Sequence, residues 1–284
     1  MINHNIKFLI VGLGLIGGSY ARGLTKKGFC VTAITKSQAS IDYAVKEKII
    51  SKGYSYVNED AVKEADIIVF SLYPQVFSQW IDEYQHLFKT GALITDVTGV
   101  KSCLVYEIQK KLRDDVEFVA AHPMAGREVY GVENSDDRMF YGANYIVVPT
   151  EKNSENAIKI CKDLGMLLGF ERISELTPEA HDEIIGFVSQ LTHCIAVSLM
   201  TCCDNEHLVD YTGDSFRDLT RIARINEDMW SELFSLNKEA LIRQMDIFAE
   251  EFSSIRDMIK NDETELLKEK MRLSTNRRAL FDKK

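Results

Sequence analysis

The chain has 284 residues, and 43 acidic side chains against 34 basic ones give it a formal net charge of −9 at pH 7. This length suits two domains of ordinary size, and the negative charge disfavours nucleic acid or an acidic membrane as a partner. An anionic ligand would therefore need a local cluster of basic side chains.

The cysteine pattern indicates reduced thiols. The six cysteines include no CxxC pair, so neither a metal site nor a redox motif is expected. We find no N-terminal targeting segment and no apolar run near the ~20 residues that span a bilayer. We therefore expect a soluble, cytoplasmic protein.

The first predicted element is a strand that breaks into glycines. An apolar run, 8–11, precedes three glycines at GxGxxG spacing, and apolar residues then resume at helical spacing. In a dinucleotide-binding unit the first glycine permits the turn, the second lets the backbone approach the pyrophosphate, and the third lets helix and strand pack closely. The pyrophosphate would lie on the positive N-terminus of the helix. The predicted cofactor contacts here are Gly12, Leu13, Gly14, Leu15, Ile16 and Gly17.

Apolar strands and helical stretches alternate through the first half of the chain. Strands are predicted at 30–35, 66–72, 92–97 and 116–121, with helices near 39–48, 76–88 and 102–112 between them. A strand, a helix and a strand at 144–149, 155–168 and 170–174 are expected to complete the same sheet. This alternation predicts a Rossmann-type α/β domain with a doubly wound parallel sheet over residues 1–176.

Ligands of such a sheet bind beyond the carboxyl ends of its strands. This rule adds further residues to the predicted cofactor site: Ser71, Leu72, Tyr73, Pro74 and Asp96. It also places His122 at the crevice. Hydride transfer to a dinucleotide needs a base for the proton that the substrate hydroxyl loses, and neutral imidazole is available near pH 7. His122 is thus the candidate catalytic base, and a loop histidine held only by structural hydrogen bonds is the alternative.

From residue 177 the pattern becomes helical, which predicts an all-α second domain over 177–284 for substrate binding and dimerisation. Thr177 and Pro178 form an N-cap and a first-turn proline. The first helix has a small, partly polar face that includes His193. A later helix has an apolar seam at alternating spacings of four and three: Leu241, Met245, Phe248, Phe252, Ile255 and Ile259. The seam is either an intrachain core stripe or the interface of a symmetric homodimer.

Three arginines, at 217, 221 and 224, share one helical face. For Arg224 we favour a solvated side chain paired with nearby aspartates. Arg221 lies in an apolar context and suits a carboxylate, which an arginine binds with two hydrogen bonds. His193, Arg127 and Arg221 together could hold a dianionic substrate.

Several motifs occur in an order that resembles the prephenate dehydrogenase family over nearly the whole chain. They are GLGLIGGS at 12–19, DVTGVK at 96–101, HPMAG at 122–126, the segment 181–193 that begins HD and ends SQLTH, DLTRIA at 218–223, and Trp230. The resemblance implies NAD(P)⁺-dependent oxidative decarboxylation of prephenate to 4-hydroxyphenylpyruvate and CO₂, a step of tyrosine biosynthesis.

The resemblance also implies roles for single residues. His122 matches the family's catalytic histidine, His193 its second-domain histidine, and Arg221 its carboxylate-binding arginine. In family members the tryptophan that matches Trp230 is supplied near the site by the other subunit, in agreement with a homodimer.

One position departs from the family pattern. Some members carry a serine where this chain has Gly99, so Thr98 is the candidate for the role of that hydroxyl. We expect neither the tyrosine-sensing ACT extension nor the fused chorismate mutase that some members carry.

Three alternatives stay open. Closely related enzymes act on arogenate, which differs from prephenate only in an amino group that replaces the keto group. A β-hydroxyacid dehydrogenase of the same architecture would use a lysine base on the helical domain, and no lysine lies on the face with His193. A non-catalytic NAD(P)-binding sensor would not need a base at His122.

The end of the second predicted strand bears on cofactor choice. A unit that prefers NAD⁺ carries an acidic residue about 20 positions after the glycines, where it binds the ribose 2′-hydroxyl. That position is Thr35 in this chain. Thr35 and Ser37 can donate hydrogen bonds to a 2′-phosphate and Lys36 adds a positive charge, so the sequence predicts NADP⁺. The alternative is a permissive pocket that uses both cofactors.

Overall fold

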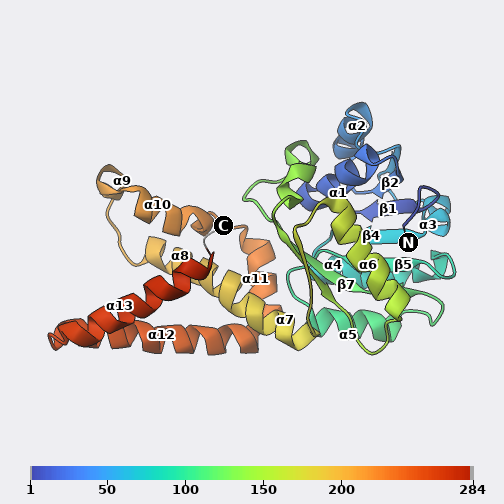
Figure 1. Ribbon diagram of the computed structural model, residues 1–284. Helices are drawn as coiled ribbons and strands as arrows, with labels where there is room; N and C mark the ends of the chain where they lie inside the picture. The colour runs from blue at the N-terminus through green and yellow to red at the C-terminus, as the bar shows by residue number, and fades with distance from the viewer. Residues whose placement is uncertain (1, 282–284) are drawn as a thin grey trace.

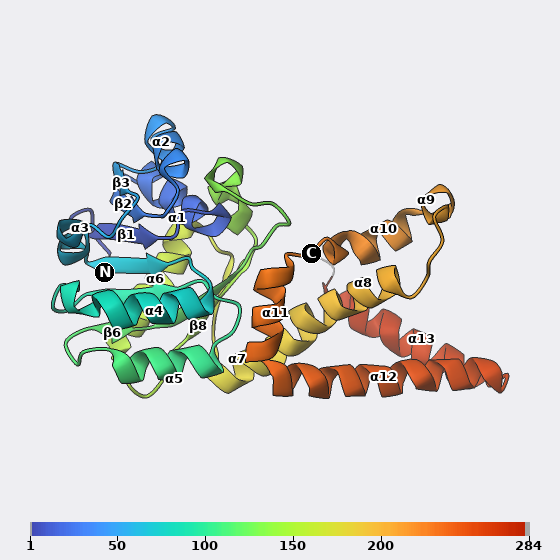
Figure 2. The same ribbon diagram turned by 180° about the vertical axis from the view of Figure 1, so that it is seen from behind.

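The computed structural model describes residues 2–281 and shows two halves side by side (Figure 1). The N-terminal half contains the sheets, with helices on both sides, and the C-terminal half consists of helices. Seen from behind, the helix that opens the C-terminal half starts beside α5 and runs away from the sheets (Figure 2).

The main sheet has six parallel strands in the order β3-β2-β1-β4-β5-β6. Its strands are β1 (Lys7–Val11), β2 (Cys30–Ile34), β3 (Lys52–Tyr54), β4 (Ile67–Phe70), β5 (Leu93–Asp96) and β6 (Glu117–Phe118). The helices between them are α1 (Leu15–Lys26), α2 (Gln38–Lys46), α3 (Glu59–Glu64), α4 (Pro74–Tyr84) and α5 (Ser102–Lys111). The predicted doubly wound parallel sheet is confirmed. The sequence did not predict β3, because its three residues carry no apolar pattern.

The expectation that the later strands complete this sheet is wrong. They form a separate sheet of β7 (Ala120–Met124), β8 (Asn144–Val148) and β9 (Arg172–Glu175), with α6 (Glu155–Leu168) before β9. β7 runs antiparallel to β8, and β8 runs parallel to β9. The apolar run that we predicted as one strand divides at Val119 between β6 and β7, which apolarity alone does not reveal. As a result His122 lies inside β7, opposite Ile146, and not in a loop after a strand.

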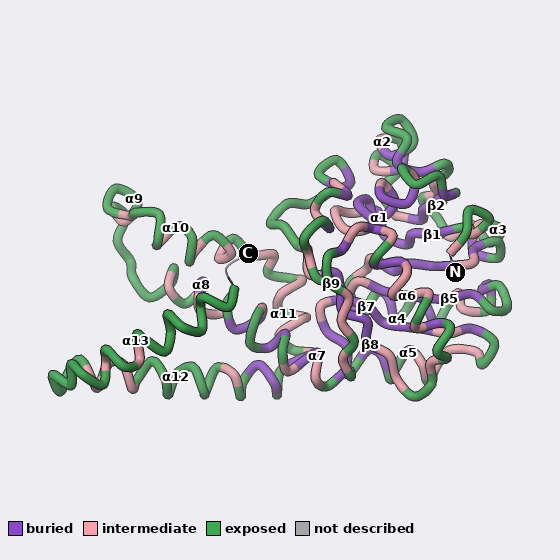
Figure 3. The backbone as a smooth tube through the Cα atoms, in the orientation of Figure 1, coloured by how far each residue is buried: buried purple, intermediate pink, exposed green. Residues whose placement is uncertain are grey.

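Successive side chains of β1 enter two different cores. Phe8 and Ile10 pack with residues of α1 and α6, whereas Leu9 and Val11 pack with residues of α4 and α5. A strand that is apolar on both faces needs this cover on both sides. Figure 3 shows that the buried backbone is concentrated in this half of the molecule.

The C-terminal half begins with one long helix in three parts. These are α7 (Pro178–Ile185), a π-helical turn (Gly186–Leu191) and α8 (Thr192–Thr201). The Thr177 hydroxyl accepts a hydrogen bond from the backbone N–H of Ala180, so the predicted N-cap is confirmed. The remaining helices are α9 (Leu208–Tyr211), α10 (Asp214–Thr220), α11 (Glu227–Leu236), α12 (Lys238–Lys260) and α13 (Thr264–Arg278).

The long helix also corrects the expectation that no apolar run approaches the ~20 residues that span a bilayer. Within residues 2–281, the 24-residue helix Pro178–Thr201 is long and apolar enough to cross a membrane by length and composition. The sequence hid this because acidic residues of its first turns interrupt the apolar run. Two of its polar residues, His181 and Asp182, are buried against the N-terminal half.

The predicted seam lies along α12, which forms a hairpin with α13 away from the sheets (Figure 1). Leu241 is buried at its start, but Phe252 is 64% exposed and Ile259 is 60% exposed. The seam is therefore not a core stripe within one chain over most of its length.

Candidate active site

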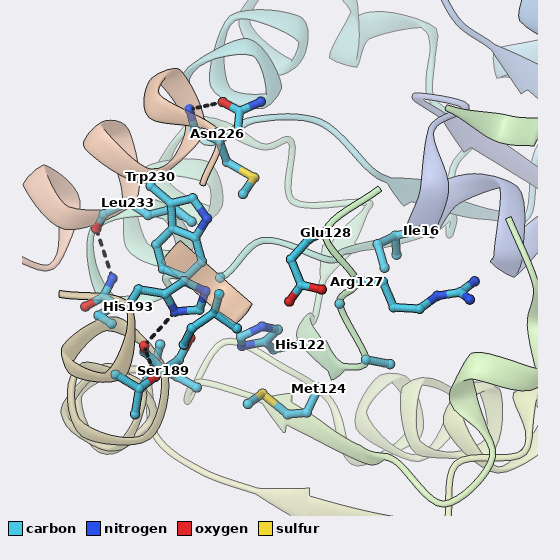
Figure 4. Close-up of a pocket in the computed structure, with 18 of the residues that line it drawn as sticks. Ile16, His122, Met124, Arg127, Glu128, Ser189, His193, Asn226, Trp230 and Leu233 are labelled. Carbon is cyan, nitrogen blue, oxygen red and sulfur yellow. Dashed lines mark hydrogen bonds between the residues drawn. The ribbon is translucent and has the colours of Figure 1, made fainter. Parts of the chain in front are cut away.

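A cavity of about 500 Å³ lies between the two halves (Figure 4). Its walls come from β7 and the loop after it, the π-helical turn, α8, the segment after α10, and α11. The residues that line it include Ile16, Gly99, His122, Arg127, Glu128, Ser189, His193, Arg221, Arg224, Trp230 and Leu233.

The imidazole of His122 is linked to a second histidine behind it. His122 Nδ1 lies 2.9 Å from His181 Nε2, and His181 Nδ1 lies 2.7 Å from Asp182 Oδ1. His181 and Asp182 belong to α7, so this row of hydrogen bonds crosses from one half of the molecule to the other. Sequence analysis did not identify His181 or Asp182 as site residues. The signal was the His-Asp pair that begins the motif at 181–193, which we used only for the family resemblance.

His122 is kept in its neutral form. Burial lowers the pKa of His122 well below its usual 6.5, and the nearby charges of His181 and Lys101 act in the same direction. A neutral imidazole near pH 7 can accept a proton, as a general base must.

Lys101 is fully buried behind this site. Its ammonium contacts Asp96 Oδ2 at 2.6 Å, the Ala121 carbonyl at 2.7 Å and the Thr98 hydroxyl at 3.1 Å. Burial lowers the pKa of Lys101, and the neighbouring Asp96 opposes that shift. The three contacts occupy the three donors of the ammonium.

This cluster corrects two predicted assignments. Asp96 was predicted to bind the cofactor, but its carboxylate is fully buried and accepts from Ala121 N and Lys101. Thr98 was predicted to be catalytic, but its hydroxyl is turned inward, where it donates to Asp96. Gly99 faces the cavity instead: a Cβ there would lie 4.0 Å from His122 Cε1 and meet nothing closer than Leu233 at 3.6 Å.

The second histidine of the cavity comes from the helical half. His193 stacks on Trp230 with ring centroids 3.7 Å apart, and its Nδ1 lies 2.9 Å from the Ser189 carbonyl oxygen. Burial lowers the pKa of His193. Trp230 reaches the cavity within its own chain, so the implied supply by another subunit is not what this structure shows.

Arg221 faces the cavity with a carboxylate beside it. Its guanidinium Nη1 lies 2.6 Å from Glu128 Oε1. Arg224 is exposed, in keeping with the prediction of a solvated side chain, but it also lines the cavity. The α10 helix ends at Thr220, and the short 3₁₀ turn Arg221–Ala223 changes the helical register between the arginines.

Arg127 lines the same cavity as His193 and Arg221, but on its other side. Its side chain lies beside Ile16 at the start of α1, whereas the carboxylate of Glu128 points into the cavity (Figure 4). Its Nη2 donates to the Asn134 carbonyl oxygen at 3.2 Å. Arg127 therefore lies on the side of the glycine-rich turn.

The glycine-rich turn has the space that a dinucleotide needs. A Cβ at Gly12 would lie 2.2 Å from the Ser71 carbonyl oxygen, and one at Gly17 would lie 2.0 Å from the Gly12 carbonyl oxygen. At Gly14, by contrast, no heavy atom lies within 4 Å of a Cβ. No side chain caps α1 and no acid occupies its first turn. These residues therefore fit a pyrophosphate at the helix N-terminus.

The remaining predicted cofactor residues divide between exposed and buried positions. Lys36 and Ser37 are exposed beyond β2, and Thr35 donates its backbone N–H to the Tyr54 carbonyl oxygen. Ser37 is the N-cap of α2, where its hydroxyl oxygen accepts from Ser40 N at 3.1 Å. Ser71, Leu72 and Tyr73 follow β4 beside Gly12, but Pro74 is buried in the first turn of α4 and lines a separate hollow.

A parallel sheet with a GxGxxG turn, joined to a helical half across a cavity that contains a neutral histidine, defines the class of NAD(P)-dependent dehydrogenases. Two family models match the chain: "Prephenate dehydrogenase, nucleotide-binding domain" at 20–171 and "Prephenate dehydrogenase, dimerization domain" at 177–273. The chain belongs to the prephenate dehydrogenase family, as its motifs predicted.

Individual relatives agree with this assignment. The prephenate dehydrogenase of Bacillus subtilis is 30% identical over 91% of this chain and 71% of its own length. The cyclohexadienyl dehydrogenase of Zymomonas mobilis is 27% identical over 95% of this chain and 94% of its own. The solved prephenate dehydrogenase of A. aeolicus, in complex with hydroxyphenyl propionate and NAD⁺, is 29% identical with a TM-score of 0.89 and covers 98% of both chains.

Proposed function

We propose that this enzyme catalyses the NAD(P)⁺-dependent oxidative decarboxylation of prephenate to 4-hydroxyphenylpyruvate and CO₂. The observation that carries the proposal is the neutral, half-buried His122 in a cavity that has arginines and a histidine on one side and the glycine-rich turn on the other. A sensor has no use for such a base.

Different residues of the chain serve proton transfer and substrate binding in this reaction. A bound oxidised dinucleotide would supply the hydride acceptor for the ring carbon that bears the hydroxyl. His122 accepts the proton of that hydroxyl through Nε2, and the loss of CO₂ makes the ring aromatic. His193, Arg221 and Arg224 supply hydrogen bonds and positive charge for the two carboxylates. Because Glu128 pairs with Arg221 in the absence of substrate, a substrate carboxylate competes with Glu128 for that guanidinium.

We assign Arg127 to the cofactor and not to the substrate. Its guanidinium lies on the side of Ile16 and the first turn of α1, where the charge of a pyrophosphate would be. The positive charge of Arg127 near this turn would attract an anionic cofactor to a chain whose formal net charge is −9 at pH 7.

For cofactor choice we propose NADP⁺ over NAD⁺. The support is the hydroxyl-rich start of α2, which has no acid in its first turn, with exposed Lys36 next to it. A 2′-phosphate there would accept hydrogen bonds from Thr35 and Ser37.

We also propose a homodimer through the helical half. The support is the exposed seam of α12 and the apolar side chains that the long helix leaves exposed, which include Phe187 at 55% and Val188 at 49%. Apolar surface of this extent favours association with a second copy.

The His122→Asn variant tests the activity. Turnover of prephenate by this variant should fall by roughly 10²- to 10⁴-fold, because the general base is lost, while cofactor binding measured by fluorescence stays unchanged. If the wild-type enzyme reduces neither NAD⁺ nor NADP⁺ with prephenate or arogenate, the sensor interpretation replaces this proposal. Faster turnover of arogenate than of prephenate would reassign the substrate.

Alanine variants of the two arginines should separate substrate from cofactor. Arg221→Ala should raise the KM for prephenate strongly, because truncating the charged pair costs about 2 to 5 kcal/mol of substrate-binding free energy. Arg127→Ala is the matched control and should raise the KM for the dinucleotide with little effect on the KM for prephenate. An equal rise in the KM for prephenate in both variants would return Arg127 to the substrate site.

The cofactor proposal predicts a larger kcat/KM with NADP⁺ than with NAD⁺ at saturating prephenate. Thr35→Asp should reverse this preference, because the new carboxylate repels the 2′-phosphate and binds the 2′-hydroxyl. A wild-type preference for NAD⁺ of tenfold or more, about 1.4 kcal/mol, would show that the proposal is wrong.

Light scattering tests the dimer. At micromolar concentration the mass should be twice the 32.3 kDa of one chain. Phe252→Asp places a charge in the exposed seam and should shift the protein toward monomer. A monomeric wild type would contradict the proposal.

A further inference from the structure

Two buried side chains, His181 and Asp182, lie directly behind His122. His181 is 0% exposed and Asp182 is 4% exposed. They start α7, whereas His122 belongs to β7, so the helical half supplies the partner of a base that the N-terminal half carries.

The Asp182 carboxylate is held by three donors. Oδ1 accepts from Lys101 N at 2.8 Å and from His181 Nδ1 at 2.7 Å, and Oδ2 accepts from Ser102 N at 2.8 Å. Burial acts to raise the pKa of Asp182, but the hydrogen bonds from His181 and Ser102 outweigh it and leave the pKa below its ordinary value. Asp182 is therefore an ionised carboxylate, which can only accept hydrogen bonds.

The position of each imidazole proton follows from this acceptor. Because Asp182 cannot donate, the proton of His181 lies on Nδ1. Burial lowers the pKa of His181, so the ring is neutral and its Nε2 is an unprotonated acceptor. His122 Nδ1 must then donate to His181 Nε2, since two lone pairs cannot face each other at 2.9 Å. Neutral His122 is left with an unprotonated Nε2.

We propose that Asp182 and His181 are positioning residues that fix the tautomer of His122 and keep its Nε2 free to take the substrate proton. This inference rests on the proposed function for its kinetic consequence, but the tautomer itself does not depend on it. In the step, the substrate O–H bond breaks and an Nε2–H bond forms on His122. The resulting imidazolium keeps its Nδ1–H bond to His181, behind which the Asp182 carboxylate stabilises the positive charge.

Other charges surround His122, but they cannot perform this role. Apart from the His181–Asp182 pair of α7, they are Lys101 and Asp96 behind it, Glu128 from the loop after β7, His193 from α8, and Arg221. Lys101 and Asp96 are occupied with each other, and Glu128 is paired with Arg221. Among the described residues only the His181–Asp182 row ends on a ring nitrogen of His122.

Nitrogen NMR of the wild-type enzyme labelled with ¹⁵N-histidine tests the tautomer directly. At pH 7.5 both His122 and His181 should show a protonated Nδ1 and an unprotonated Nε2, with the signals assigned by His122→Asn and His181→Gln. A proton on His122 Nε2 would overturn the inference whether or not the enzyme turns prephenate over.

The kinetic arm uses Asp182→Asn. Its amide can donate to His181 Nδ1 and thereby favour the opposite tautomers, so kcat with prephenate should fall by roughly 10²- to 10⁴-fold. The KM values for prephenate and the dinucleotide should change little. The acid limb of the kcat profile should move to lower pH, because the carboxylate no longer stabilises the protonated ring.

Tyr106→Phe is the matched control. It removes the 2.7 Å hydrogen bond from Tyr106 to Glu179, another link between α5 and α7, without touching the row of histidines. Its kcat and pH profile should match the wild type. If Asp182→Asn keeps the wild-type kcat and acid limb while wild-type turnover is normal, the inference fails and the proposed function stands. If Asp182→Asn does not fold, the wild-type NMR spectrum decides alone.

Discussion

The buried ammonium of Lys101 connects the three parts of the molecule that meet at the site. Its side chain contacts Asp96 at the end of β5 and the Ala121 carbonyl in β7, and its backbone N–H donates to Asp182 in α7. Burying two charges is costly unless hydrogen bonds occupy their remaining donors and acceptors, and here they do. Because the main sheet and the smaller sheet both contribute partners, the ion pair is satisfied only when these two are in their native arrangement, and the backbone N–H of Lys101 joins the same residue to the helical half.

The position of His122 depends on this arrangement in two ways. The chain leaves the main sheet after β6 and enters β7, which places the imidazole within a strand and not on a loop. The same residue then finds its hydrogen-bond partner on a helix of the other half. A rigid strand and a buried partner together hold the imidazole ring in one orientation, which the proposed role as a general base requires.

The sequence predicted the elements well where they are long and periodic, and it predicted His122, His193 and Arg221 as site residues. It did not separate one sheet from two, because apolar alternation describes burial and not which strand pairs with which. It placed Asp96 in the cofactor site because this residue lies at the carboxyl end of a strand, and it gave Thr98 a catalytic role because Gly99 replaces a serine of the family. The side chains of both residues are instead turned inward toward Lys101. Polar residues that serve a buried ion pair and polar residues that serve a ligand have the same sequence signature, and only packing distinguishes them.

The π-helical turn Gly186–Leu191 has a consequence for how one helix can serve two tasks. Each residue of an α-helix advances the side-chain direction by about 100°, so one extra residue within a turn rotates everything after it relative to everything before it. Asp182 lies before the turn and faces the sheets, and His193 lies after it and faces the cavity. Within the turn, the side chain of Gln190 accepts a hydrogen bond from Asn237 and donates one to the Leu233 carbonyl oxygen, so the turn holds a fixed angle between the segments before and after it. One residue inserted into or deleted from this turn therefore changes the direction of His193, without disturbing the contact between Asp182 and the N-terminal half.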